Sequence, residues 1–204
     1  MPDCGCEFEI KNKTQAHVLK QLLLINALMF FIEISFGVIA ESTALIADSL
    51  DMFADAAVYG VALYAVARSL LAKERAAKIS GLLQIGLGLL VLADVVRRFI
   101  TGSEPDSVLM ILVGFVALVS NIICLKLLSS HRDGEVHMRA SWVFSKNDVI
   151  ANIGIILSGV FVYYSGLAIA DLVIGFIISL IVVRGGIEIL RDVESEVKRC
   201  DSEE

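Results

Sequence analysis

ESTALIADSLDMFADAAVYG, residues 41–60, places three aspartates within a segment that is otherwise mostly apolar. Asp48, Asp51 and Asp55 follow one another at i, i+3 and i+7, a spacing that brings them to one face of an α-helix. A charged side chain at the centre of a membrane helix costs about 3 kcal/mol on insertion scales, so it normally faces a protein or water-filled interior. The segment therefore predicts a membrane-spanning helix with an acidic stripe directed inward.

The composition extends this interpretation to all 204 residues. Hydrophobic residues make up 57% of the chain, against about 45–50% in soluble domains, and the mean hydropathy is +0.79. We expect an all-α, polytopic membrane protein, because lipid offers no partner for unpaired backbone groups. A span needs about 20 mostly apolar residues, and six such runs predict six transmembrane helices: 18–40, 44–71, 79–100, 108–128, 149–165 (starting earlier, near Met138) and 167–190.

Basic residues predict the orientation of these spans. They collect at the N-terminus, in the second connection (71–78), in the fourth connection (129–139) and after residue 190. All four places lie on one side of a six-helix path, which the positive-inside rule assigns to the cytoplasm. We expect a cell (inner) membrane protein in contact with lipid, with a membrane domain at 17–192 between a cytoplasmic segment (1–16) and a short cytoplasmic tail (193–204). The net charge of −6 argues against a nucleic-acid partner.

A second polar stripe occurs in MRASWVFSKNDVIANIGII, residues 138–156. Ser145, Asp148 and Asn152 share one helix face, and each can offer an oxygen. If Asp148 met Asp51 and Asp55 at mid-membrane, they would form an oxygen-rich site for a divalent cation. Asn152 is a neutral fourth ligand in this interpretation, or else makes a helix–helix hydrogen bond.

Several other polar residues leave two interpretations open. Asp48 either joins the metal site or satisfies neighbouring helices, and Glu33 in the first span is either a proton-linked group or hydrogen-bonded within the bundle. Cys4 with Cys6, and His131 with His137, could collect metal near the entrance. A disordered end and a solvated loop are the favoured alternatives for those two pairs.

Residues 41–55 resemble the second-helix signature of the cation diffusion facilitator family, in which a Ser-x-Ala-Leu-x-Ala-Asp-Ser segment leads to two ligands four residues apart. Those ligand positions are Asp51 and Asp55, and NDVIAN (147–152) resembles the fifth-helix motif with Asp148 as the ligand. The resemblance implies a homodimer of six-helix subunits that exports Zn²⁺, or a related ion such as Co²⁺, Mn²⁺, Cd²⁺ or Fe²⁺, from the cytoplasm in exchange for protons.

The chain departs from this family in two respects. The family usually has His or Asp four residues before the fifth-helix aspartate, where this chain has Phe144. Without an imidazole, oxygen donors favour harder ions such as Mn²⁺, or weaker binding of Zn²⁺ or Co²⁺, unless Ser145 or Asn147 compensates. Members also usually carry a soluble C-terminal metal-binding domain, and we expect a short form that lacks it.

The acid–base chemistry of the cluster predicts the mechanism. Empty carboxylates in a low dielectric hold protons, and a dication displaces them, so we expect metal–proton antiport rather than enzyme activity. A non-transporting metal-binding subunit or chaperone of a resistance system remains the main alternative. A membrane enzyme with a metal bound for hydrolysis is disfavoured, because the acids fall mid-span rather than near an interface.

Overall fold

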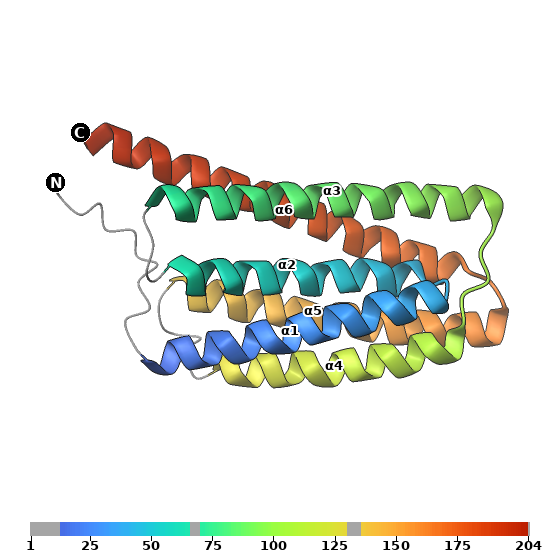
Figure 1. The fold of residues 1–204 in the computed structure, drawn as a ribbon. Helices are drawn as coiled ribbons and strands as arrows, with labels where there is room; N and C mark the ends of the chain where they lie inside the picture. Colours follow the sequence, from blue (N-terminus) through green and yellow to red (C-terminus); the bar gives the residue numbers. More distant parts are fainter. Residues whose placement is uncertain (1–12, 66–69, 130–135, 204) are drawn as a thin grey trace.

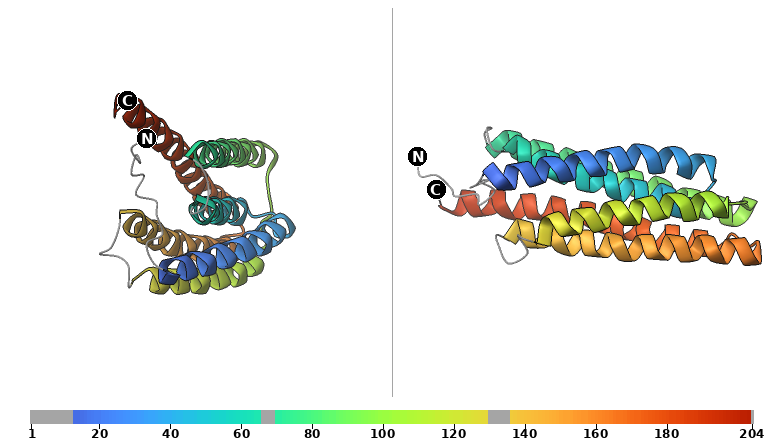
Figure 2. Two further views of the ribbon diagram at one scale, coloured as in Figure 1. Left: turned by 60° about the vertical axis from the view of Figure 1, so that its left-hand side comes forward. Right: turned by 90° about the horizontal axis from the view of Figure 1, so that it is seen from below.

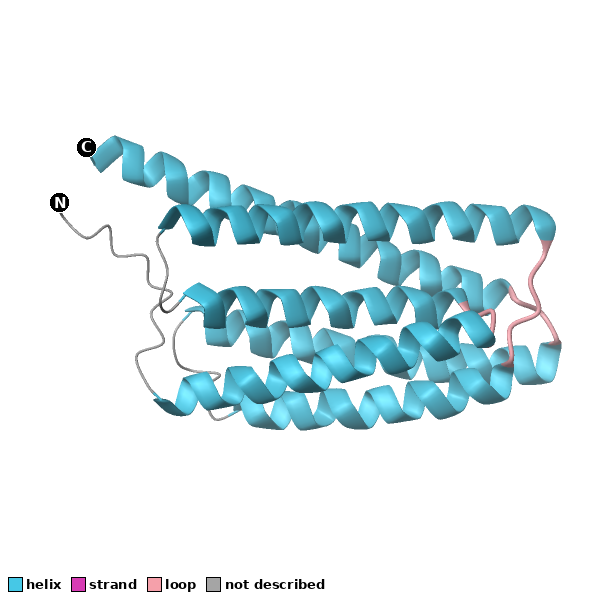
Figure 3. Ribbon diagram, in the orientation of Figure 1, coloured by secondary structure: helices cyan, strands magenta, loops and turns pink. Residues whose placement is uncertain are grey.

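The structure, a computed structural model, describes residues 13–65, 70–129 and 136–203. Cys4, Cys6 and His131 lie outside these ranges, and the side chain of His137 is not described. The described chain is all-helical (Figure 3). It consists of α1 (Lys13–Ile39), α2 (Thr43–Ala65), α3 (Leu70–Thr101), α4 (Ser107–Ser129), α5 (Val136–Ser165) and α6 (Ile169–Glu203).

The helices run alternately up and down a common axis, so α1 begins and α6 ends at the same end of the molecule (Figure 1). We call this the terminal end. The opposite end, here the turn end, holds the connections α1–α2, α3–α4 and α5–α6. Gly166 has a φ of 67° where α5 meets α6, a left-handed conformation that favours glycine. The predicted division between a span ending at residue 165 and a span beginning at residue 167 therefore falls at this turn.

Among the described residues, five helices contain a stretch long and apolar enough to cross a membrane: Ala16–Ile39, Ala77–Thr101, Ser107–Ser129, Ser145–Ser165 and Ile169–Glu194. Large apolar side chains point outward, as at Leu90 (67% exposed) and Phe99 (70%). Fully buried positions include Asn26, Glu33 and Asp48. This distribution, with apolar groups outside and polar groups inside, is that of a multi-pass membrane protein.

α2 lies at the centre of the packing and contacts every other helix. α1, α4 and α5 pack on one side of it, and α3 with an oblique α6 on the other (Figure 2). Glycines allow α3 and α6 to approach closely. A Cβ added at Gly186 would lie 2.8 Å from the backbone oxygen of Gly81, a small-residue interface typical of membrane helices.

The boundary between the second and third spans differs from the expectation. We expected a span to residue 71 followed by a basic connection, but α3 already begins at Leu70. Lys73, Arg75 and Lys78 thus lie on its first turns rather than in a loop. The sequence LLAKERAAK consists of strong helix formers, so its charges mark where the apolar part of the helix begins, and not where the helix begins.

Candidate metal centre

The acidic stripe of α2 faces the other helices. Asp48 is fully buried, Asp51 and Asp55 are half-buried, and Tyr59 one turn further on is buried. The Tyr59 hydroxyl donates a hydrogen bond to Asp55 Oδ2 over 3.4 Å. From Asp48 to Tyr59 the stripe runs from the turn end toward the terminal end, because α2 begins at the turn end. The four side chains therefore form a polar line through the middle of the bundle.

Asp148 on α5 joins this line. Its side chain is 9% exposed and lies within hydrogen-bonding reach of the Asp51 carboxyl group. Two carboxyl groups at this separation repel each other unless a proton or a cation lies between them. The structure therefore brings together acids from α2 and α5, 97 positions apart in the chain (148 minus 51), at a point suited to a positively charged ligand.

A second pair of acids lies next to the first. Glu33 on α1 and Asp48 on α2 are both 0% exposed, and their side chains contact each other. No hydrogen-bond donor reaches any of their four carboxylate oxygens. Asn152 on α5 lies beside Asp48. Its Nδ2 donates to the backbone oxygen of Asp148 over 2.8 Å, while its Oδ1 has no hydrogen-bond partner.

These acids have no basic partner in the described part of the chain. Where both partners lie in the described ranges, ion pairs join Asp94 to Arg97 and Arg98, and Arg184 to Glu188. Uncompensated carboxylates repel, so the cluster requires protons or a bound cation. Across the described ranges, no three His, Cys, Asp or Glu side chains are gathered into a ready ligand cage. The acids meet as pairs, which is the arrangement that two shared protons would stabilise.

Ser145 and Asn147, the residues that could compensate for the missing imidazole, lie in different surroundings. Ser145 is buried and its hydroxyl donates to the backbone oxygen of Asn121 on α4 over 3.4 Å. Asn147 is exposed, because it lies one position from Asp148 and so about 100° around the helix. The structure therefore does not bring Asn147 to the acids. The Phe144 side chain is outside the part of the chain whose side chains are described.

Cys124 is a further residue near the acids, and it is not among the ligands expected from the sequence. It lies on α4, 2% exposed, within electrostatic range of Asp55 and Asp148. Its Sγ accepts a hydrogen bond from Asn26 Nδ2 over 3.8 Å. Its position three residues after Asn121 puts the two polar groups on one face of an apolar helix. That spacing was the available signal in the sequence, and the fold brings the Cys124 thiol within electrostatic range of acids on α2 and α5.

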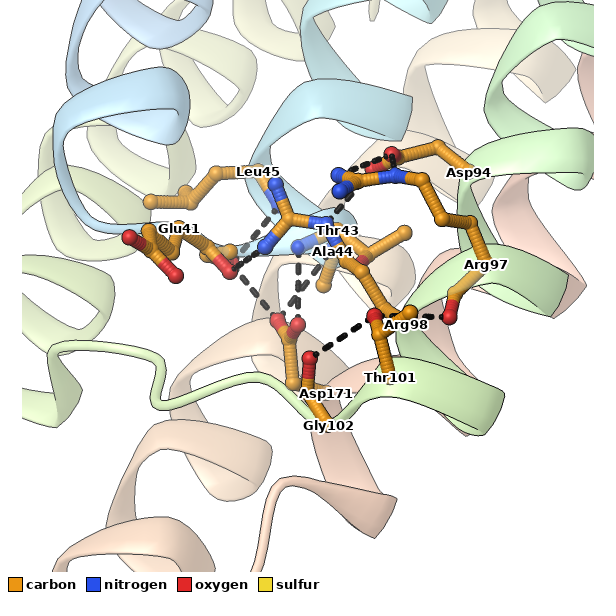
Figure 4. A network of polar contacts seen from close by, with 11 residues as sticks. Glu41, Thr43, Ala44, Leu45, Asp94, Arg97, Arg98, Thr101, Gly102 and Asp171 are labelled. Atoms are coloured by element: carbon orange, nitrogen blue, oxygen red, sulfur yellow. Dashed lines mark hydrogen bonds and ion pairs between the residues drawn. The ribbon is translucent and has the colours of Figure 1, made fainter.

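A polar network fixes the turn end of α2 (Figure 4). The Asp171 carboxylate on α6 accepts hydrogen bonds from Ser42 Oγ (2.6 Å) and from the backbone N–H groups of Thr43 (2.7 Å) and Ala44 (3.1 Å). Arg98 on α3 pairs with Asp94 and donates to the backbone oxygen of Glu41. A buried carboxylate thus caps α2 from another helix, which holds the acidic stripe in register with α3 and α6.

Comparison with known proteins gives a consistent result. The family model described as the cation efflux transmembrane domain matches residues 19–76 and 72–196. The metal cation efflux system protein CzcD of Cupriavidus metallidurans is 25% identical over 174 residues, which cover 79% of this chain and 55% of that protein. The zinc transporter ZitB of Escherichia coli is 24% identical over 186 residues, 85% of this chain and 59% of that protein.

A third relative is named the cadmium, cobalt and zinc/H(+)-K(+) antiporter of Bacillus subtilis. It is 24% identical over 194 residues, which cover 85% of this chain and 61% of the relative. The chain thus spans 55–61% of the length of these three curated relatives.

Proposed function

Because the chain belongs to the cation efflux family, we propose that it exports a divalent transition-metal cation, Zn²⁺ or a related ion, in exchange for protons. Relatives of similar sequence are named for zinc, cadmium and cobalt transport. One observation in this chain carries the proposal: the contact between Asp51 on α2 and Asp148 on α5, with no basic partner for either in the described residues.

Asp51, Asp55 and Asp148 are the proposed ligands of the transported ion. The half-burial of Asp51 and Asp55 leaves them reachable, whereas Glu33 and Asp48 are sealed. Cys124 supplies a sulfur donor from α4, which compensates for the missing imidazole and favours softer ions such as Zn²⁺ and Cd²⁺.

Proton exchange follows from the pairing of acids. Without metal, the Asp51–Asp148 pair is stabilised by a proton between its members, since adjacent carboxylates in a low dielectric cannot both be charged. A dication bound by Asp51, Asp55 and Asp148 supplies two positive charges and displaces protons from these groups. Return of protons from the opposite side then expels the ion. The same groups therefore bind either protons or metal, which couples the two fluxes.

The proposed topology has six membrane spans. They are the five apolar helices and α2, which spans the membrane although it carries three aspartates. Its 23 residues extend over about 34 Å, enough to cross the hydrocarbon core. Basic residues 73, 75, 78 and 191 lie at the terminal end, which supports a cytoplasmic terminal end in the inner membrane. The membrane domain at 17–192 and the homodimer implied by the resemblance complete the proposal.

Transport is tested with the purified chain in proteoliposomes. With an acidic lumen, external Zn²⁺ is expected to accumulate, and the uptake should collapse when an ionophore dissipates the pH difference. Asp51→Asn is expected to abolish uptake. Glu188→Gln removes an exposed carboxylate on α6 and serves as the matched control, with uptake unchanged. Uptake that ignores the pH difference would refute antiport, and metal binding without any flux would favour a metal-binding subunit.

A further inference from the structure

The Glu33–Asp48 pair is not used by the proposed transport site. Asp48 precedes Asp51 by three residues on α2, which places the pair about 4.5 Å nearer the turn end. Both side chains are fully buried, and they come from different helices. Burying two carboxyl groups in contact costs free energy that no hydrogen bond in the described structure offsets. A bound positive charge would offset this cost.

Asn152 adds an independent observation. Its side chain is 0% exposed and reaches Asp48 from a third helix, α5. Nδ2 is used by the Asp148 backbone oxygen, so Oδ1 remains as a buried acceptor without a donor. A buried acceptor of this kind is rare in a native interior. The Asn152 amide beside Asp48 therefore adds an oxygen-bearing group from a third helix to the Glu33–Asp48 pair, and carboxylate and amide oxygens together suit a hard cation.

We propose that Glu33, Asp48 and Asn152 form a second cation site, which receives the dication from the Asp51–Asp55–Asp148 site on its way to the turn end. This inference rests on the proposed transport function. The two negative charges of Glu33 and Asp48 match the charge of a dication, whereas a monovalent ion would leave one negative charge uncompensated. Two dications one helical turn apart repel strongly, so the two sites hold the ion alternately rather than together.

The two sites differ in accessibility and in donor chemistry, and both differences give the path a direction. The first site is half-buried and has Cys124 nearby, whereas the second is sealed and offers only oxygen. Oxygen donors hold Zn²⁺ and Cd²⁺ less tightly than a set that includes sulfur. The ion therefore moves from the tighter, accessible site to a weaker, enclosed one, from which release toward the turn end is easier.

Mn²⁺ is a suitable probe, because it prefers oxygen ligands and its bound fraction is measured by electron paramagnetic resonance. In the full chain in nanodiscs, Asp51→Asn combined with Asp148→Asn removes the first site. We expect one Mn²⁺ to remain bound per chain, and its affinity to fall about tenfold or more when Glu33→Gln is added. Glu188→Gln on the same background is the control and should leave this binding unchanged.

A second measurement uses Glu33→Gln alone, which keeps the first site intact. We expect Zn²⁺ affinity within about threefold of the wild-type value, because the first site is intact. Zn²⁺ flux should fall about tenfold, because the second binding site on the path is lost. Flux equal to wild type, or no residual Mn²⁺ in a folded double variant, would overturn the second site. Failure of the proposed transport function would give another result, because the wild-type chain itself would then show no pH-driven Zn²⁺ uptake.

Discussion

The Asp171 carboxylate on α6 accepts a hydrogen bond from the backbone N–H of Thr43, the first residue of α2, over 2.7 Å. The same carboxylate also accepts hydrogen bonds from the Ser42 hydroxyl and from the backbone N–H of Ala44. The helix that carries the acidic stripe is thus capped by a residue 128 positions away in the chain. The cap at the start of α2 therefore depends on a residue of α6, so a movement of α6 acts directly on the helix that carries the acids.

Asp171→Ala is expected to destabilise the protein by about 3 kcal/mol, because it leaves a buried hydroxyl and two backbone N–H groups without an acceptor. Asp171→Asn keeps one acceptor and should lose less. Denaturant unfolding in detergent micelles, followed by circular dichroism, measures both. Equal stability of Asp171→Ala and wild type would show that water replaces the carboxylate at no cost.

Substitution of the proposed ligands should affect metal binding rather than folding. Asp51→Asn, Asp55→Asn and Asp148→Asn each remove one charge while keeping the side-chain shape, and each is expected to weaken Zn²⁺ binding at least about a hundredfold. Isothermal titration calorimetry gives the affinities. An Asp51→Asn variant with wild-type affinity would remove the central residue from the site.

Metal affinity should rise with pH. Because the paired acids hold protons that a dication must displace, each proton released makes the apparent affinity about tenfold stronger per pH unit in the range where the pair is protonated. Titrations in two buffers with different ionisation enthalpies report the number of protons released. Affinity that does not change with pH, with no buffer dependence of the heat, would contradict proton exchange.

Cys124 should influence which ion is preferred. Cys124→Ser exchanges a soft donor for a hard one with little change in volume. We expect Cd²⁺ binding to fall about tenfold relative to Mn²⁺, since thiolate favours the softer ion. Competition between the two ions on one sample gives the ratio directly. If Cys124→Ser and wild type show the same ratio, the thiol does not contact the ion and serves only as the acceptor for Asn26.

Much of the site could be anticipated from local periodicity. The i, i+3, i+7 spacing of Asp48, Asp51 and Asp55 puts them on one face whatever the neighbours are. Charge in an apolar span predicts that this face is directed inward. The accessory role expected of Asn147 did not follow from this periodicity, because one position along a helix turns a side chain about 100° away from Asp148, and Asn147 is exposed.

The sequence by itself determined the all-helical class, the apolar character of the spans and the acidic face of α2, since these depend on composition and helical period. Only the tertiary structure decided that Asp51 meets Asp148, that Glu33 meets Asp48 and that Asp171 caps α2. Each of these contacts joins residues from different helices. Their distances depend on how whole helices tilt and pack, and a one-dimensional pattern carries no information about which faces of two distant helices come into contact.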